Sequence, residues 1–252
     1  MKKTILAVLA APLLFTNCIG LTELNSQRMY QNSHSTLPTT HTTITAHSGA
    51  YGTPDNSLRY IETALRNNVE ILEFDVNIRP NGTLVMYHDQ VPNDLTGYEV
   101  DRALEMIRGT RTKVNLDIKN TSVLASLRQM VLRHGMINQV FLTGIRENDV
   151  MIVRQRFPEV KYYLNCDLDP KRYYDSRYLN EILMMLRRTG AVGINCHYSM
   201  ANQTLSNWLH RNGYKLSVWT PNKRSQIRDA AGYYPDNITT RHPNRANKRV
   251  KR

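Results

Sequence analysis

The sequence predicts a single (β/α)8 barrel over residues 41–243. Short runs rich in β-branched and aromatic residues alternate with amphipathic segments whose apolar residues recur at helical spacing. Eight such β-prone runs in about 200 residues match a parallel barrel, whose strands need helical crossovers. A doubly wound open sheet is the alternative, although no G-x-G-x-x-G motif opens the first expected helix.

The expected strands are short, and polar residues follow most of them. They cover residues 43–47, 70–76, 83–88, 113–118, 139–143, 161–165, 192–195 and 215–219. Helices are expected over residues 57–67, 122–134, 147–156, 175–188, 202–212 and 223–231, with Asn56 as the N-cap of the first. Only the connection over residues 90–111 is irregular, and it is expected to hold at most one short helix, near residues 100–108.

The stretch from Glu70 to Asp89 carries the first candidate site residues. Glu73 and Asp75 lie two positions apart in a strand, so they project from the same face. Two carboxylates on one face repel each other, and a hard divalent cation such as Ca²⁺ or Mg²⁺ would relieve the repulsion. A Pro-Asn-Gly turn at residues 80–82 then leads to a second strand that ends in His88. Taken singly, these residues would also suit solvated acids and a core histidine.

Other strand ends supply further polar groups. His47 ends the first expected strand, Asp117 and Lys119 end the fourth on one face, and Trp219 ends the eighth. Catalytic groups of a (β/α)8 barrel gather at the carboxyl ends of its strands. Carboxylates that hold a divalent cation, a lysine and two histidines are the groups that phosphoryl transfer uses. The sequence therefore predicts a phosphodiester site made of Glu73, Asp75 and Asp117 for the cation, His47 and His88 for proton transfer, and Lys119 for the phosphate.

Seven motifs in chain order resemble the landmarks of the glycerophosphodiester phosphodiesterase family. They are His47-Ser48-Gly49, Pro54-Asp55-Asn56-Ser57, Glu73-Phe74-Asp75-Val76, His88-Asp89, Asp117-Ile118-Lys119, Val218-Trp219-Thr220 and Ile238-Thr239-Thr240. The resemblance implies a barrel in which His47 and His88 are the acid/base pair and Glu73, Asp75 and Asp117 bind Ca²⁺ or Mg²⁺. It also implies hydrolysis of glycerophosphodiesters to glycerol phosphate and an alcohol.

The motifs also depart from the family pattern. Ser48 stands where the family has an arginine that grips the substrate phosphate, which leaves more of that charge to Lys119. Asp55 and Asp117 each replace a glutamate with a shorter acid. The absent arginine, the Asp-Ile-Lys motif and Trp219 as a substrate-binding residue also resemble the spider-venom type phospholipases D, which form a cyclic phosphate from lysophospholipids. A non-catalytic phosphodiester-binding barrel is a further alternative.

The first 40 residues have the layout of an exported protein. Residues 1–18 contain two lysines, an apolar run and then small and polar residues, as in a secretory signal peptide. Cys18 closes a segment similar to a bacterial lipobox, so a lipid tether through Cys18 is expected, in a periplasmic or membrane-anchored lipoprotein, with secretion as the alternative. Residues 19–40 are expected to form a flexible leader. Cys166 and Cys196 are expected to be buried free thiols, with a disulfide as the alternative.

Half of the net charge of +12 lies at the end of the chain, where six basic residues and no acid occur among residues 241–252. Residues 244–252 form a basic tail, expected to be solvated and disordered, and attraction to anionic lipid is the alternative reading. No nucleic-acid-binding module is recognisable in the body of the chain. The expected partner is a small phosphodiester or lysophospholipid substrate.

Overall fold

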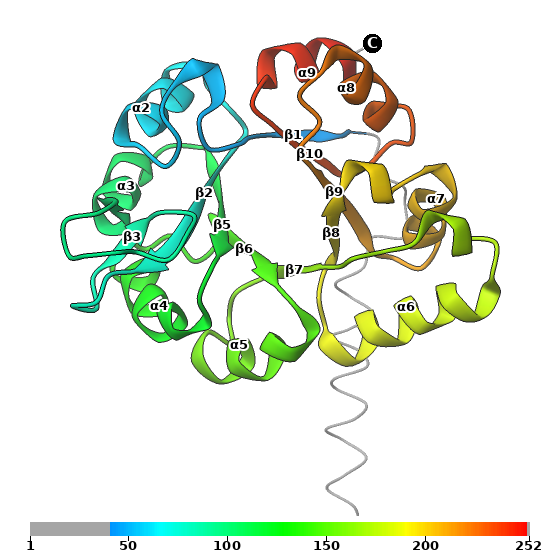
Figure 1. Ribbon diagram of the computed structural model, residues 1–252, viewed down its shortest axis with the longest axis horizontal. Helices are drawn as coiled ribbons and strands as arrows, with labels where there is room; N and C mark the ends of the chain where they lie inside the picture. The colour runs from blue at the N-terminus through cyan, green and yellow to red at the C-terminus, as the bar shows by residue number, and fades with distance from the viewer. Residues whose placement is uncertain (1–40, 251–252) are drawn as a thin grey trace, which may run out of the picture. The chain divides into compact units, whose positions relative to one another are not determined.

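The computed structural model describes residues 41–250, which contain a closed ring of parallel strands (Figure 1). In ring order these are β1 (Thr43–Ala46), β2 (Ile71–Ile78), β5 (Lys113–Ile118), β6 (Val140–Ile145), β7 (Tyr162–Asn165), β8 (Gly193–His197), β9 (Lys215–Trp219) and β10 (Asn237–Thr240). β1 pairs with β10 on one side and with β2 on the other, so the sheet has no free edge within the ring. The predicted (β/α)8 barrel is confirmed.

Helices surround the strand ring (Figure 1). They are α2 (Leu58–Arg66), α3 (Val100–Ile107), α4 (Leu124–Arg133), α5 (Val150–Arg156), α6 (Ser176–Thr189), α7 (Gln203–Arg211), α8 (Arg224–Ala231) and α9 (Pro243–Val250). Short 3-10 turns lie at η1 (Ala50–Gly52), η2 (Thr121–Val123), η3 (Glu147–Asp149), η4 (Pro170–Arg172) and η5 (Tyr198–Met200). Within residues 41–250, none of the helices combines the length and the apolar character needed to cross a bilayer.

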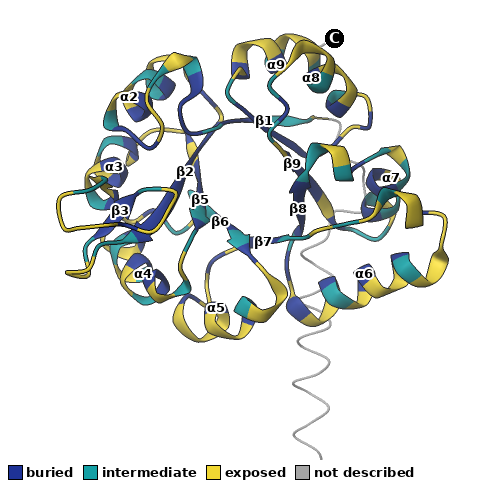
Figure 2. Ribbon diagram, in the orientation of Figure 1, coloured by how far each residue is buried: buried dark blue, intermediate teal, exposed yellow. Residues whose placement is uncertain are grey.

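The hydrophobic core lies between the strands and the helices, and the strands are largely buried (Figure 2). Residues such as Leu72, Leu116 and Leu164 are fully buried, whereas the residues that alternate with them are often polar. Asn195 donates to Asn165 at 3.0 Å, one of several side-chain hydrogen bonds between neighbouring strands. Because buried polar groups need partners, these pairs allow a polar cavity inside the ring.

The predicted third strand is not part of the barrel. β3 (Leu84–Met86) pairs antiparallel with β2, and β4 (Tyr98–Glu99) pairs antiparallel with β3. The turn at residues 80–82, where Gly82 has φ 90°, is too short for the crossover that a parallel pair requires. The remaining barrel strand is β10, which was not among the predicted strands because its four residues, Asn-Ile-Thr-Thr, carry little hydrophobic pattern.

Two local predictions are also wrong. The N-cap of α2 is Ser57, whose hydroxyl accepts from the Tyr60 amide at 3.1 Å, and Asn56 has another role described below. The expected disordered end instead forms α9 up to Val250, with Ala246 fully buried. The predicted signal peptide (residues 1–18) with Cys18, the leader (19–40) and the last two residues lie outside the described part of the chain.

The prediction of buried free thiols is confirmed for Cys196 and only in part for Cys166, which is free but partly exposed. Cys166 and Cys196 are both free, and Cys196 is completely buried. Burial raises the pKa of the Cys166 thiol to about 12, so this cysteine remains protonated and unreactive at neutral pH.

Candidate active site

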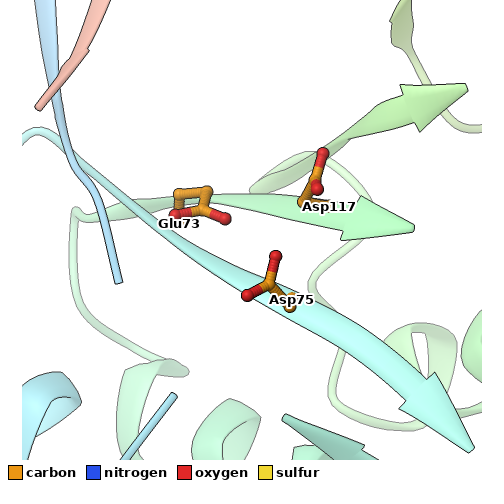
Figure 3. A group of neighbouring side chains, drawn as sticks. All are labelled: Glu73, Asp75 and Asp117. Carbon is orange, nitrogen blue, oxygen red and sulfur yellow. The ribbon is translucent and has the colours of Figure 1, made fainter. Parts of the chain in front are cut away.

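Three carboxylates gather where β2 and β5 run side by side (Figure 3). Asp75 and Asp117 are paired in the parallel register of β2 and β5. Glu73 lies two residues before Asp75 on the same face of β2. One oxygen from each of the three lies within 4.8 Å of those of the other two. The spacing of two between Glu73 and Asp75 therefore has the predicted effect, and the strand register adds Asp117.

The cluster has the electrostatics of a cation site. Burial raises the pKa of Glu73, and the neighbouring charges of Asp75 and Asp117 raise it further. A divalent ion bound between buried carboxylates offsets the repulsion between their negative charges. Ca²⁺ and Mg²⁺ both prefer oxygen ligands. This donor set fits either ion.

Neighbouring polar groups fix the orientation of each acid. The Ser48 amide donates to Glu73 Oε2 at 2.9 Å, and the Thr143 hydroxyl donates to Asp117 Oδ1 at 2.6 Å. Next to Thr143, Gly144 has φ 76°, and a Cβ there would lie 2.4 Å from the Ile118 carbonyl oxygen, so only glycine allows this close approach.

Asn56 orients Asp75 through two side-chain hydrogen bonds. Its amide nitrogen Nδ2 donates to Asp75 Oδ2 at 2.6 Å, and its Oδ1 accepts from the Asp75 backbone amide at 3.0 Å. The Asn56 backbone amide in turn donates to the Ser48 hydroxyl at 2.8 Å. Sequence reasoning missed this role, although Asn56 belongs to the Pro-Asp-Asn-Ser motif that carried the family resemblance.

Lys119 lies against two of the acids. Its Nζ is 2.9 Å from Asp75 Oδ1 and 2.6 Å from Asp117 Oδ2. Burial opposes its charge, but Asp117 and Asp75 outweigh this and raise its pKa, so Lys119 is cationic throughout the physiological range.

The two predicted histidines differ in their surroundings. His47 follows β1 and is half-buried, and its Nδ1 lies 2.8 Å from the Ser48 carbonyl oxygen. A carbonyl only accepts, so Nδ1 carries the proton and Nε2 of the neutral ring is free to take one. Burial lowers the pKa of His47; the Ser48 carbonyl opposes this, and the charge of Arg241 adds to the lowering.

His88 reaches the site from outside the ring. It follows β3, and its Nδ1 lies 2.7 Å from Asp89 Oδ1. The side chain is exposed at the rim, and it nevertheless lines the same cavity as the acids. Although β3 is not a barrel strand, it runs back antiparallel along β2, and the Tyr87 amide donates to the Asp75 carbonyl at 3.3 Å, so His88 follows at the level of the acids.

One cavity of about 520 Å³ contains every predicted site residue. Trp219 at the end of β9 also lines it, with 38% of its surface exposed and its ring edge-on to His197 at 5.4 Å between centroids. Sequence reasoning missed Arg146 and Arg241 as cavity residues, although each comes directly after a barrel strand and Arg241 follows the Ile238-Thr239-Thr240 motif. The lining that matches the predictions consists of His47, Glu73, Asp75, His88, Asp117, Lys119 and Trp219.

Solved structures of glycerophosphodiester phosphodiesterases have the same fold. One from Parabacteroides distasonis is 19% identical, with a TM-score of 0.65, and the match covers 83% of this chain and 97% of that one. Another from Agrobacterium tumefaciens is 18% identical, with a TM-score of 0.64 and coverages of 82% and 99%. The likeness in fold agrees with the resemblance in the sequence motifs.

A third similar structure contains a reaction product. It is a phosphodiesterase from Oleispira antarctica in complex with sn-glycerol-3-phosphate, 16% identical, with a TM-score of 0.69 and coverages of 83% and 97%. No protein-family model matches this chain, and no curated protein matches it significantly.

Proposed function

We propose that this chain is a metal-dependent phosphodiesterase that hydrolyses glycerophosphodiesters to glycerol phosphate and an alcohol. The observation that carries the proposal is the cavity in which three clustered carboxylates, two histidines and a lysine converge. The phosphodiesterases of similar fold, one of them with bound sn-glycerol-3-phosphate, support the choice of substrate class.

Glu73, Asp75 and Asp117 would hold Ca²⁺ or Mg²⁺. When bound there, the cation supplies Lewis-acid polarisation of a phosphate oxygen. Asn56, Thr143 and the Ser48 amide keep the carboxylates in place, and Lys119 limits their repulsion.

The histidines divide the proton transfers. Nε2 of His47 takes a proton from the attacking water as its oxygen bonds to phosphorus, because Nδ1 is occupied by the Ser48 carbonyl and the lowered pKa keeps the ring neutral. His88, whose Nδ1 faces the Asp89 carboxylate, gives a proton to the leaving alkoxide as its bond to phosphorus breaks.

The test is turnover of glycerophosphocholine, glycerophosphoethanolamine and lysolipids, with EDTA and with added Ca²⁺ or Mg²⁺, followed by ³¹P NMR. We expect glycerol phosphate and complete loss of turnover in EDTA, and we expect His47→Ala to lower kcat by about 100-fold or more. Binding without turnover under all these conditions would contradict the proposal and indicate a non-catalytic phosphodiester-binding barrel.

A phospholipase D-like lyase is the second candidate. It is favoured by Ser48 in place of an arginine and by the exposed Trp219 at the cavity mouth. Here a hydroxyl of the substrate gives its proton to one histidine and attacks its own phosphorus, and the alcohol leaves with a proton from the other histidine. A cyclic phosphate that accumulates in the ³¹P NMR spectrum would identify this reaction.

Export with a lipid anchor on Cys18 is part of the proposal. It is supported by the layout of residues 1–18. Cys18→Ser should move the protein from the membrane fraction to the soluble fraction, whereas Cys166→Ser should leave its distribution unchanged.

A further inference from the structure

The cavity has to bind a phosphodiester anion if the proposed function is correct, yet its best-placed cation is already engaged. The Lys119 ammonium contacts both Asp75 and Asp117, and its side chain is 78% covered. Its charge therefore mainly offsets two carboxylates. Besides the proposed divalent ion, a side-chain cation that is less engaged than Lys119 would be free to meet the anion.

Ser48 contributes no charge. The side chain is buried, its backbone amide donates to Glu73, and its hydroxyl accepts from the Asn56 amide. These bonds commit Ser48 to holding the acid cluster together.

Arg241 supplies a guanidinium to the same cavity. Its Nη2 donates to Asp55 Oδ2 at 2.6 Å, and 43% of the side chain is exposed. Among residues 41–250, Asp55 is the only hydrogen-bond partner of this guanidinium, so its remaining N–H groups are available to a ligand.

The surrounding backbone fixes where this guanidinium lies. The Arg241 amide donates to Asn222 Oδ1 at 2.9 Å, which ties the residue to the segment after β9. Asp55 is packed against Gly49, where φ is 77° and a Cβ would lie 1.9 Å from Asp55 Oδ1. Position 49 therefore has to be glycine for Asp55 to hold the guanidinium as it does.

The strand order places Arg241 and Lys119 on opposite sides of His47. Arg241 follows β10 and Lys119 follows β5, while β1 and β2 lie between them in the ring. An anion next to His47 would thus have a cation on either side.

We propose that Arg241 is the residue that grips the substrate phosphate, in the role that the family resemblance would give to an arginine at position 48. A guanidinium offers two parallel N–H donors to phosphate oxygens, which an ammonium does not. Asp55 is a positioning residue that holds the guanidinium from its other side. This inference rests on the proposed function, because it presumes a phosphodiester in the cavity.

The test compares Arg241→Gln and Arg241→Lys with Arg245→Gln. Arg245 lies four residues further on, in α9, and donates to the Asn222 carbonyl, but it does not line the cavity. The readouts are the KM and kcat for glycerophosphodiesters, the Kd for sn-glycerol 3-phosphate by calorimetry with Mg²⁺ present, and the Kd for Mg²⁺ alone.

We expect Arg241→Gln to raise the KM and the Kd for sn-glycerol 3-phosphate by about 10- to 100-fold, with Arg241→Lys recovering only part of the loss. Affinity for Mg²⁺ alone should not fall, and Arg245→Gln should match the wild type. Asp55→Asn should raise the KM more than it lowers kcat, and Asp55→Glu should restore the KM.

The outcomes separate this inference from the proposed function. A wild type that turns over substrate while Arg241→Gln keeps the KM and Kd within twofold overturns the role of Arg241 and leaves the phosphodiesterase standing. If the wild type binds sn-glycerol 3-phosphate through Arg241 but shows no turnover, the role of Arg241 in phosphate binding stands and the enzymatic proposal is overturned. Absence of both binding and turnover overturns both.

Discussion

At the scale of single residues, Glu73 couples the metal site to stability. Because its folded pKa is raised, protonated Glu73 contributes stability that is fully present below its ordinary pKa of 4.5 and is lost as the pH rises through the folded value. Without a divalent ion, the unfolding free energy should therefore fall by up to about 1.4 kcal/mol for each unit of pH increase between the ordinary pKa of Glu73 and its raised folded pKa. Denaturant titrations in EDTA between pH 4 and pH 8 measure this slope.

Glu73→Gln should flatten that slope and abolish the response to the ion. The glutamine carbonyl can still accept from the Ser48 amide, so the fold should be retained. The wild type should gain about 2.7 kcal/mol when the ion is present at 100 times its Kd, and the variant should gain little. An equal ion-induced rise in Tm for both proteins would show that Glu73 is not a ligand.

Asn56→Ala should weaken ion binding without contacting the ion. The substitution removes both side-chain hydrogen bonds to Asp75, and groups that orient metal ligands typically contribute 10- to 100-fold in affinity. Calorimetric titration with Ca²⁺ or Mg²⁺ measures the change.

Asn68→Ala is the matched control for Asn56→Ala. Both asparagines have φ 51°, so the backbone strain of an alanine is the same at each, but Asn68 is exposed and lines no part of the active-site cavity. If both variants bind the ion alike, the two hydrogen bonds to Asp75 do not matter for affinity.

At the scale of elements, α9 is part of the folded barrel. Ala246 is fully buried and the helix contacts both α8 and β1, whereas Lys248 is exposed. Ala246→Glu should lower the unfolding free energy by about 3 kcal/mol or more, since it buries a charge without a partner. Lys248→Glu introduces the same side chain at an exposed position and should change stability by less than about 0.5 kcal/mol.

Chemical denaturation of these two variants decides between a packed helix and a solvated tail. A disordered end would tolerate glutamate equally well at both positions. The hydrophobic signal that marks α9 is weak, since Ala246 is one small residue beside three basic ones in Pro243–Val250, and composition alone therefore suggests a tail.

At the scale of the whole molecule, the fold and most of the site follow from patterns of short period. The alternation of two within β2 places Glu73 and Asp75 together, and strand ends in a barrel converge, so Asp117 and His47 join them. The count of eight barrel strands was right only because the β3 hairpin strand was counted and β10 was missed. Periodicity does not reveal strand direction, which depends here on a turn too short for a crossover.

The residues that sequence reasoning missed act through tertiary neighbours. Asn56 meets Asp75 from a loop 19 positions earlier, and Arg241 meets Asp55 from 186 positions away. Neither contact produces a periodic pattern in the sequence. Only closure of the ring between β10 and β1 brings Arg241 beside the first loop of the barrel.

The net charge of +12 should speed capture of anionic substrates, since the basic helix α9 begins two residues after Arg241 at the cavity rim. Raising the ionic strength from about 10 mM to about 0.15 M shortens the Debye length from about 30 Å to about 8 Å, and kcat/KM for glycerophosphoglycerol should fall several-fold while kcat changes little. Glycerophosphocholine, which carries no net charge, is the matched substrate and should respond far less. Lys248→Glu combined with Arg249→Glu should weaken the salt dependence for the anionic substrate. The same salt dependence for both substrates would mean that the field of the molecule plays no part in capture.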